Sequence, residues 1–182
     1  MDVRFAGFGG QGIILAGIVL GKAVAVCDER NATQVQSYGP ESRGGSCRSE
    51  VVVSDEPIDY PSIIEADVLV AMSQEAADKF VGNVKKGGLV IIDSMLVKLP
   101  EPVDIKVHRI PATEVAIREL GRQTGANMIM LGALVALTNI TTEDAVHRSL
   151  KETVPRGTEE SNLKAFQLGL KLANEASGQA VA

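Results

Sequence analysis

Short apolar runs, together with partly polar segments at residues 32–37, 46–53 and 103–109, are spaced along the first 110 residues of the chain between glycine, proline and polar residues. Apolar runs of this length between such breaks are typical of buried strands. The pattern therefore predicts strands at residues 3–6, 32–37, 46–53, 67–71, 89–93 and 103–109.

Longer stretches carry apolar residues at helical spacing. They predict helices at residues 12–26, 74–84, 113–123, 127–137, 142–153 and 161–175. Ser73 is the expected N-cap of the second helix, which Gly87 and Gly88 are expected to terminate. On the first helix, Gly17 and Gly21 lie four residues apart and share a face, which predicts a close approach to the sheet or to a partner.

The order of these elements predicts an α/β fold. Strands and helices alternate first, which favours a mainly parallel open sheet with helices on both faces, and a helical C-terminal part follows. At 182 residues, without a linker or an internal repeat, the chain is expected to form one Rossmann-like domain over residues 1–182. Residues 177–182 are expected to be a flexible tail.

Charge and composition argue against two classes of partner. The net charge is −5 and aromatic residues make up only 3% of the chain, so neither a basic stripe nor a stacking platform for nucleic acid is available. The apolar stretch at residues 13–26 is too short to span a membrane and contains Lys22. Because the first residues lead straight into a strand instead of a signal sequence, we expect a soluble protein of the cytoplasm.

Candidate groups for catalysis and metal binding are sparse. Cys27 and Cys47 form no C-x-x-C pair, and two thiolates cannot hold an iron–sulfur cluster or a structural zinc ion. His108 and His147 are isolated in the sequence and are expected to be surface or packing residues. We therefore expect no metal site and no catalytic residue on this chain.

A glycine-rich segment joins the first strand to the first helix. Its glycines match G-x-G-x-x-G, a pattern whose backbone N–H groups can close on a phosphate. We therefore treat this glycine loop as a candidate anion site, and close packing of helix on strand is the alternative reason for the pattern. Its residues are Gly7, Gly9, Gly10, Gln11 and Gly12.

The rest of the sequence supports a dinucleotide site poorly. Such a site places an acidic residue at the end of the second strand, where this chain has Ser37 and Tyr38. Asp28 and Glu29 have the right spacing from the glycines, but they precede that strand and should lie at its opposite end. A P-loop is also excluded, because Lys22 is followed by alanine and lies inside a helix.

The segment from Ser37 to Glu50 joins two predicted strands. If the strands run parallel, it lies at the same edge of the sheet as the glycine loop. Its glycines and proline restrict the loop at chosen points, which suits the presentation of charged groups to a ligand or a partner. An ordinary solvated loop is the alternative. The polar and glycine residues singled out here are Tyr38, Glu41, Arg43, Gly44, Gly45 and Arg48.

Three motifs together resemble the gamma subunit, or gamma domain, of the 2-oxoacid:ferredoxin oxidoreductases. The family's G-x-G-G-Q-G start appears at residues 7–12, its Y-G-x-E-x-R-G-G loop at residues 38–45, and its N-M-x-x-L-G-A-L helix at residues 127–134. A late helix with Asn162, Ala165 and Phe166 also fits. The resemblance covers nearly the whole chain in order, and the 2-oxoglutarate type is the most similar.

The resemblance implies oxidative decarboxylation of a 2-oxoacid, with acylation of coenzyme A and reduction of ferredoxin. Thiamine diphosphate and iron–sulfur clusters carry that chemistry, and this chain has a motif for neither. The family thus implies alpha and beta partner subunits, with or without a ferredoxin-like delta subunit. It also implies that Tyr38, Glu41, Arg43, Gly44 and Gly45 contact coenzyme A or a partner chain. Because both cofactor motifs are missing, we expect the isolated chain to be inactive. The helices at residues 12–26 and 127–137 carry more apolar residues than one sheet face needs, so we expect the chain to self-associate, for example as a homodimer, when its partners are missing.

Alternatives remain open at this point. Branched-chain, pyruvate and indolepyruvate enzymes share the same motifs. A different functional class is also open: the chain could be a free-standing nucleotide-binding regulator with the same fold, because a fold does not fix a function.

Overall fold

A six-stranded sheet forms the centre of the protein. The computed structural model describes residues 1–38, 46–100 and 104–176. The strands lie in the order β2-β3-β1-β4-β5-β6. β3 runs antiparallel to both of its neighbours, whereas β1, β4, β5 and β6 pair in parallel, so the predicted mainly parallel sheet is confirmed. The strands are β1 (Asp2–Phe8), β2 (Asn31–Tyr38), β3 (Ser46–Ser54), β4 (Ala66–Ala71), β5 (Val84–Asp93) and β6 (Lys106–Ile110).

Each of the six predicted helices is present. A π-helical turn (Ala23–Cys27) extends the first helix, and a 3₁₀ turn (Val81–Asn83) follows the second. Ser73 caps α2 as predicted, since its side chain accepts a hydrogen bond from the Ala76 amide at 3.2 Å. The helices are α1 (Ile13–Lys22), α2 (Gln74–Phe80), α3 (Ala112–Leu120), α4 (Ala126–Thr138), α5 (Glu143–Thr153) and α6 (Glu159–Ala176).

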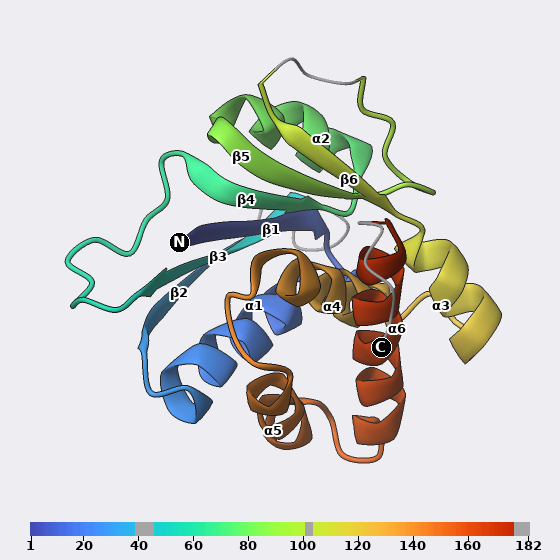
Figure 1. The fold of residues 1–182 in the computed structure, drawn as a ribbon. Helices are drawn as coiled ribbons and strands as arrows, with labels where there is room; N and C mark the ends of the chain where they lie inside the picture. Colours follow the sequence, from blue (N-terminus) through green and yellow to red (C-terminus); the bar gives the residue numbers. More distant parts are fainter. Residues whose placement is uncertain (39–45, 101–103, 177–182) are drawn as a thin grey trace.

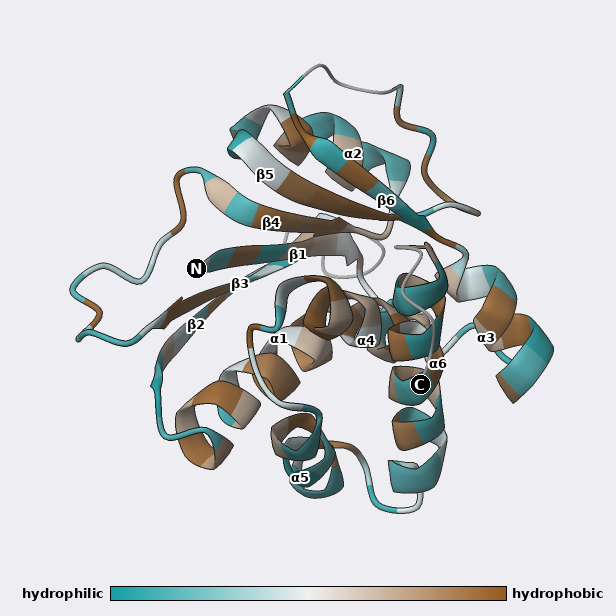
Figure 2. Cartoon of the chain, viewed as in Figure 1, coloured by the Kyte–Doolittle hydropathy of each residue, from teal (hydrophilic) through white to brown (hydrophobic). Residues whose placement is uncertain are grey.

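The helices cover the two faces of the sheet unequally. α2 lies on one face, and α1, α4, α5 and α6 gather on the other (Figure 1). Side chains alternate along β1, so Val3 and Phe5 join the large core under α1 and α4, while Ala6 joins the smaller core under α2. Figure 2 shows the hydrophobic residues concentrated along the central strands and along α4.

Gly17 lets α1 lie close to the sheet, as predicted. A Cβ atom at Gly17 would collide with the Ser49 hydroxyl on β3, whereas a Cβ at Gly21 would meet Gln34 and Val51 only at ordinary contact distances of 3.8 and 4.0 Å. Only the first glycine of the pair is therefore required by the close approach.

The prediction that Gly87 and Gly88 end the second helix is wrong. α2 ends at Phe80, and both glycines lie inside β5. Gly87 has a φ of +77°, and a Cβ at Gly88 would lie 2.9 Å from the Asp67 carbonyl oxygen. The register between β4 and β5 shifts at this point, so the glycine pair allows a bulge in a strand.

Two predicted boundaries also move. α3 stops at Leu120 because Gly121, with a φ of +69°, forms its left-handed C-cap. β6 begins at Lys106, and residues 101–103 lie outside the described residues, as does the predicted tail at 177–182.

Candidate functional site

The glycine loop leaves the sheet at its carboxyl edge, where β1, β4, β5 and β6 end. Gly7 still belongs to β1, and the loop proper runs from Gly9 to Gly12 before α1 begins. After β1 the chain continues to β2 and β3 on one side of the sheet, whereas after β4 it continues to β5 and β6 on the other side, so the strand order reverses between β1 and β4. The loop thus lies at the point where an open α/β sheet forms its ligand crevice.

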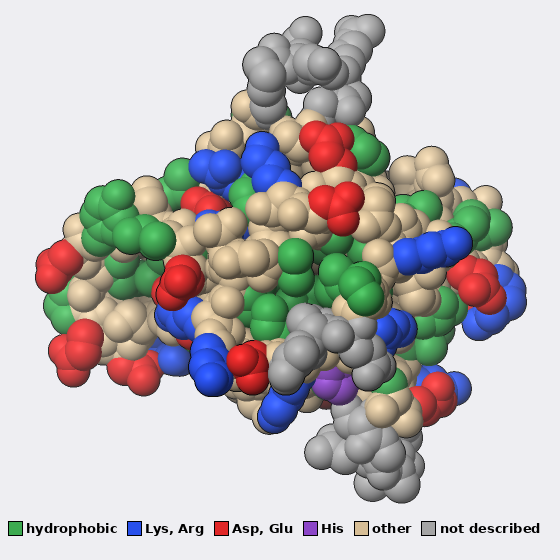
Figure 3. Space-filling model, turned by 90° about the horizontal axis from the view of Figure 1, so that it is seen from above, with side chains coloured by type: hydrophobic (Ala, Val, Ile, Leu, Met, Phe, Trp, Pro, Cys, Tyr) green, Lys and Arg blue, Asp and Glu red, His purple; other side chains and the backbone are tan. Residues whose placement is uncertain are grey.

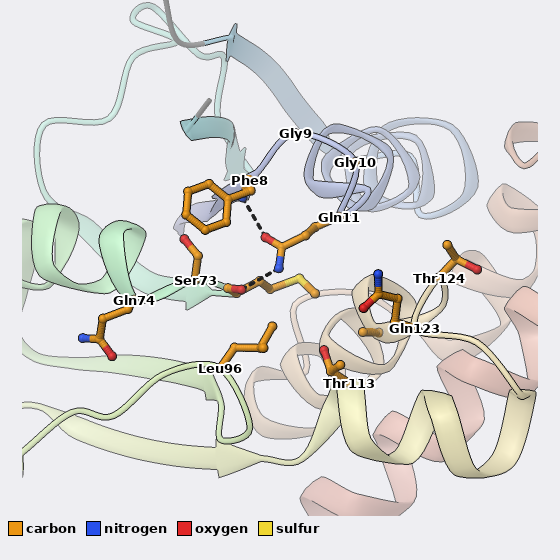
Figure 4. Close-up of a pocket in the computed structure, with 12 residues that line it drawn as sticks. Phe8, Gly9, Gly10, Gln11, Ser73, Gln74, Leu96, Thr113, Gln123 and Thr124 are labelled. Carbon is orange, nitrogen blue, oxygen red and sulfur yellow. Dashed lines mark hydrogen bonds between the residues drawn. The ribbon is translucent and has the colours of Figure 1, made fainter. Parts of the chain in front are cut away.

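Gln11 fixes the glycine loop against the next strand. Its side-chain oxygen accepts a hydrogen bond from the Phe8 amide at 2.7 Å, and its side-chain nitrogen donates to the Met72 carbonyl at 2.7 Å (Figure 4). The side chain crosses Gly7, where a Cβ would collide with it. The Phe8 and Gln11 amides are already used within the loop, so fewer backbone donors are left for an anion.

Gly12 connects the glycine loop to α4. It has a φ of +76°, and its carbonyl accepts a hydrogen bond of 3.1 Å from the Asn127 side chain. A Cβ at Gly12 would collide with that same side chain. Two of the motifs that carry the family resemblance, 115 residues apart, therefore meet in space.

A pocket of about 460 Å³ opens beside the glycine loop, between the ends of β1, β4 and β5 (Figure 4). Phe8, Met72 and Leu96 supply apolar surface, and no ionisable side chain lines it among the described residues. The pocket therefore suits an uncharged group held by amides and hydroxyls. Its polar side chains are those of Gln11, Ser73, Gln74, Thr113, Gln123 and Thr124.

Asp93 lies behind the pocket wall and holds one of its lining residues, Thr113. The sequence analysis did not identify Asp93 as a functional residue. It is fully buried at the end of β5 and accepts hydrogen bonds from the Thr113 amide (3.0 Å), the Thr113 hydroxyl and the Met95 amide (3.2 Å). Burial raises the pKa of the Asp93 carboxyl above its ordinary value, although these hydrogen bonds act in the opposite direction. Asp93 thereby positions Thr113, which lines the pocket.

The loop between β2 and β3 starts and ends at the same edge as the glycine loop, as predicted. Tyr38, at the end of β2, pairs with Cys47, and Ser46 pairs with Phe8 at the end of β1. Tyr38 is 66% exposed. Glu41, Arg43, Gly44 and Gly45 lie outside the described residues.

The acidic pair before β2 lies at the opposite end of that strand, as expected. Asp28 accepts hydrogen bonds there from the Thr142 amide (3.3 Å) and the Thr142 hydroxyl (3.0 Å), so it ties the start of α5 to the end of the π-helical turn. It cannot reach a ligand at the glycine loop, and the geometry therefore does not support a dinucleotide site.

The two histidines lie away from the carboxyl-edge pocket. His147 packs edge-on against Phe166, with ring centroids 5.8 Å apart. Burial and the Lys106 ammonium lower the pKa of His108, which lines a hollow at the other edge of the sheet. In the described part of the chain, no group of three or more His, Cys, Asp or Glu side chains could hold a metal ion, and no helix is long and apolar enough to cross a membrane.

Comparison with known proteins identifies the family. Residues 2–172 match the family described as pyruvate ferredoxin/flavodoxin oxidoreductase. The chain belongs to this family. One relative in it, the 2-oxoglutarate synthase subunit KorC of Methanocaldococcus jannaschii, is 50% identical over 177 residues, which cover 96% of this chain and 94% of that protein.

Solved structures show the same fold within the pyruvate ferredoxin/flavodoxin oxidoreductase family. The gamma subunit of a keto/oxoacid ferredoxin oxidoreductase from Geobacter sulfurreducens matches with a TM-score of 0.85 and 39% identity, over 96% of this chain and 99% of that one. A 2-oxoglutarate:ferredoxin oxidoreductase from Magnetococcus marinus, with 2-oxoglutarate, coenzyme A and succinyl-CoA bound, matches with a TM-score of 0.87 and 27% identity. That match covers 96% of this chain but 31% of the other, so the same fold forms one part of a longer chain there.

Proposed function

We propose that the chain is the gamma subunit of a multisubunit 2-oxoglutarate:ferredoxin oxidoreductase of the cytoplasm. Within that complex it supports the oxidative decarboxylation of 2-oxoglutarate, in which coenzyme A is acylated and ferredoxin is reduced. The observation that carries the proposal is the similarity of nearly the whole chain, at half identity, to a 2-oxoglutarate synthase subunit. The fold shared with a gamma subunit supports it.

The cofactors of the reaction belong to partner subunits in this proposal. Thiamine diphosphate and iron–sulfur clusters supply the carbanion stabilisation and the electron transfer when bound there. The residues of this chain do not fit a cluster, because Cys27 and Cys47 are two thiols where a cluster takes four thiolates. Its carboxyl-edge pocket also lacks an ionisable side chain for proton transfer.

The carboxyl edge is the surface that we assign to the alpha and beta subunits. Phe8, Tyr38, Met95 and Leu96 follow or end three different strands at this edge, and each is at least 37% exposed. Exposed apolar side chains gathered around a pocket mark an interaction surface more often than a solvated one. Docking at this edge would bring the glycine loop toward a partner's active site.

The loop after β2 is the part of this edge that we propose to engage coenzyme A or a partner chain. Arg43 carries a planar fork of donors that suits a phosphate or a carboxylate, and Glu41 can orient it. Tyr38, Gly44 and Gly45 frame these two side chains in the sequence. The glycine loop forms the neighbouring floor.

Arg43→Lys in the assembled enzyme tests this loop. We expect a higher KM for coenzyme A, because lysine keeps the charge and loses the fork, whereas Arg156→Lys between α5 and α6 should change nothing. If gel filtration of the Arg43 variant instead shows loss of the complex, the side chain pairs across a subunit boundary. Unchanged assembly and unchanged coenzyme A kinetics in Arg43→Ala would contradict the assignment.

Co-purification tests the proposed function itself. The tagged chain, isolated from its native source, should bring with it larger subunits that carry thiamine diphosphate and iron–sulfur clusters. Branched-chain, pyruvate and indolepyruvate enzymes would give the same subunits and differ in the 2-oxoacid oxidised. A lone chain that binds a nucleotide would overturn the proposal in favour of a regulator.

A further inference from the structure

A small hollow separates the end of α2 from the neighbouring ends of β2 and β3. It has a volume of about 170 Å³ and lies on the α2 face, apart from the pocket beside the glycine loop. Figure 3 looks onto this face, where Lys and Arg side chains lie among Asp and Glu side chains in the upper part and elsewhere. Ser37 and Arg48 are direct partners across the two strands, and Lys79 approaches from the last turn of α2.

Positive charge exceeds negative charge in this hollow. Glu50 is buried and forms an ion pair with Arg4 at 2.7 Å, and the Arg48 Nε lies 3.5 Å from the same carboxylate oxygen. Lys79 forms no ion pair with any described residue. The guanidinium carbon of Arg48 and the ammonium nitrogen of Lys79 lie 5.9 and 5.4 Å from the centre of the Phe80 ring. Two cations, Arg48 and Lys79, therefore line the hollow, and the carboxylate that lies near Arg48 is already paired with Arg4.

Hydroxyl groups complete the lining. Ser37, Tyr38 and Ser46 contribute to the hollow. None of their hydroxyls bonds to another described residue. A guanidinium fork, an ammonium group and several free hydroxyls together suit an anion with three or more acceptor oxygens. At about 170 Å³ the hollow is smaller than the roughly 300–1,000 Å³ of pockets for whole small molecules, so it has room for one charged group.

We propose that this hollow binds a phosphate group, either as free phosphate or as the monoester end of a larger molecule. Arg48 and Lys79 provide the charge, and Ser37 and Ser46 donate hydrogen bonds to the remaining oxygens. Because Tyr38 also belongs to the carboxyl edge and the hollow adjoins the loop assigned above to coenzyme A or a partner chain, the inference deepens the proposed function and rests on it. The test uses the chain without its partners, so its failure is distinct from a failure of the proposed function.

Titration of the ¹⁵N-labelled full-length chain, followed by nuclear magnetic resonance, tests the site. We expect inorganic phosphate and glycerol 3-phosphate, at constant ionic strength, to shift the amide signals of Ser37, Tyr38, Ser46 and Arg48 saturably. Acetate should bind at least about fivefold more weakly, since it offers two acceptor oxygens. Tighter binding of the ester than of the free ion would identify an esterified ligand, and the reverse would identify free phosphate.

Two variants and one control distinguish phosphate binding in this hollow from nonspecific attraction of phosphate to surface lysines. Arg48→Gln should weaken binding about tenfold or more, and Lys79→Gln, an exposed position that leaves the fold intact, about threefold or more. Lys151→Gln on α5, also exposed, should bind phosphate like the wild type. Shifts that never saturate, or that are the same in Lys79→Gln and wild type, would overturn the proposal.

Discussion

Gly12 is the residue at which the glycine loop and α4 depend on each other. Glycine adopts the left-handed backbone conformation of this position with little strain. The Asn127 side chain occupies the space that a Cβ would need. Gly10 also has a positive φ, of +94°, but nothing lies within 4 Å of a Cβ placed there. A substitution at Gly10 therefore introduces backbone strain alone, whereas the same substitution at Gly12 introduces backbone strain and a steric clash.

We predict that Gly12→Ala destabilises the protein more than Gly10→Ala does. The strain of a left-handed alanine costs about 1–3 kcal/mol at either position, and the clash with Asn127 adds about 1–3 kcal/mol at Gly12 only. Urea unfolding of the two variants measures the difference. In an Asn127→Ala background the two costs should become similar, and a persistent difference there would contradict the clash.

Asp93 gives a prediction about pH. Because burial raises its pKa in the folded state, the folded protein holds this proton more tightly than the unfolded chain, whose aspartates titrate near about 3.9. The free energy of unfolding contributed by Asp93 should therefore fall as the pH rises from the unfolded pKa through the folded one. The ¹³C signal of its carboxyl carbon should titrate above about 3.9.

Asp67 is the internal contrast in the same titration. Burial raises its pKa, but the Lys85 ammonium and the Asp2 amide outweigh that effect and hold the pKa below the ordinary value. A midpoint for Asp93 at or below that of Asp67 would contradict the account of the buried carboxyl.

Sequence reasoning at this scale found the glycines and missed their partners. Glycine spacing marks a loop that needs backbone freedom, but no local pattern shows that Gln11 crosses Gly7 or that Asn127 reaches Gly12. Asp93 is a single acidic residue at the end of an apolar strand, and its three hydrogen bonds come from residues that follow it in the chain. Such contacts are set by packing, which the periodicity of a sequence does not encode.

At the scale of elements, α4 and α6 pack directly against each other. A Cβ at Gly132 would collide with the Phe166 carbonyl, and one at Gly169 would collide with the Ile129 carbonyl. These are backbone atoms of the facing helix, which cannot move as a side chain can. Both helices can approach so closely only because each presents a glycine.

We predict that Gly132→Ala lowers the free energy of unfolding by more than about 3 kcal/mol, because the added methyl group pushes two core helices apart. Gly82→Ala is the matched control, since Gly82 has open space around its Cβ position and no positive φ. Thermal or urea unfolding compares the two variants. Equal stability of Gly132→Ala and the control would show that the helices have room to separate.

The types of the elements were predictable, and the direction of one strand was not. The sequence pattern predicted all six strands, but nothing in their composition shows that β3 turns back beside β2 and so runs against β1. The Gly87–Gly88 pair looked like a helix end because glycines usually follow helices, whereas here they accommodate a bulge in β5. Long-range strand pairing decided both points.

At the scale of the whole molecule, four of the ten large apolar side chains that are exposed among the described residues lie at the carboxyl edge. The sequence suggested that α1 and α4 carry more apolar residues than a sheet face needs. α4 is buried all round from Ala126 to Val135, because α6 covers the side that the sheet does not. Phe8, Tyr38, Met95 and Leu96 remain exposed instead.

We predict that the isolated chain self-associates at micromolar concentration through this edge. Light scattering should show a species larger than the monomer, and Leu96→Gln together with Met95→Gln should reduce it, since both side chains are more than a third exposed. Ile64→Gln, exposed at 78% and lying just before β4 at the opposite edge of the sheet, is the control. A clean wild-type monomer would argue against the edge as a docking surface.

The central claim is that this chain is a necessary gamma subunit of an enzyme whose cofactors lie on other subunits. Reconstitution of the complex with and without the chain tests it most directly, with viologen reduction followed for 2-oxoglutarate, pyruvate and branched-chain 2-oxoacids in the presence of coenzyme A. We predict no reduction by the chain alone and coenzyme A-dependent reduction by the complete complex, fastest with 2-oxoglutarate. Full activity of the partner subunits without this chain, or reduction by this chain alone, would contradict the account.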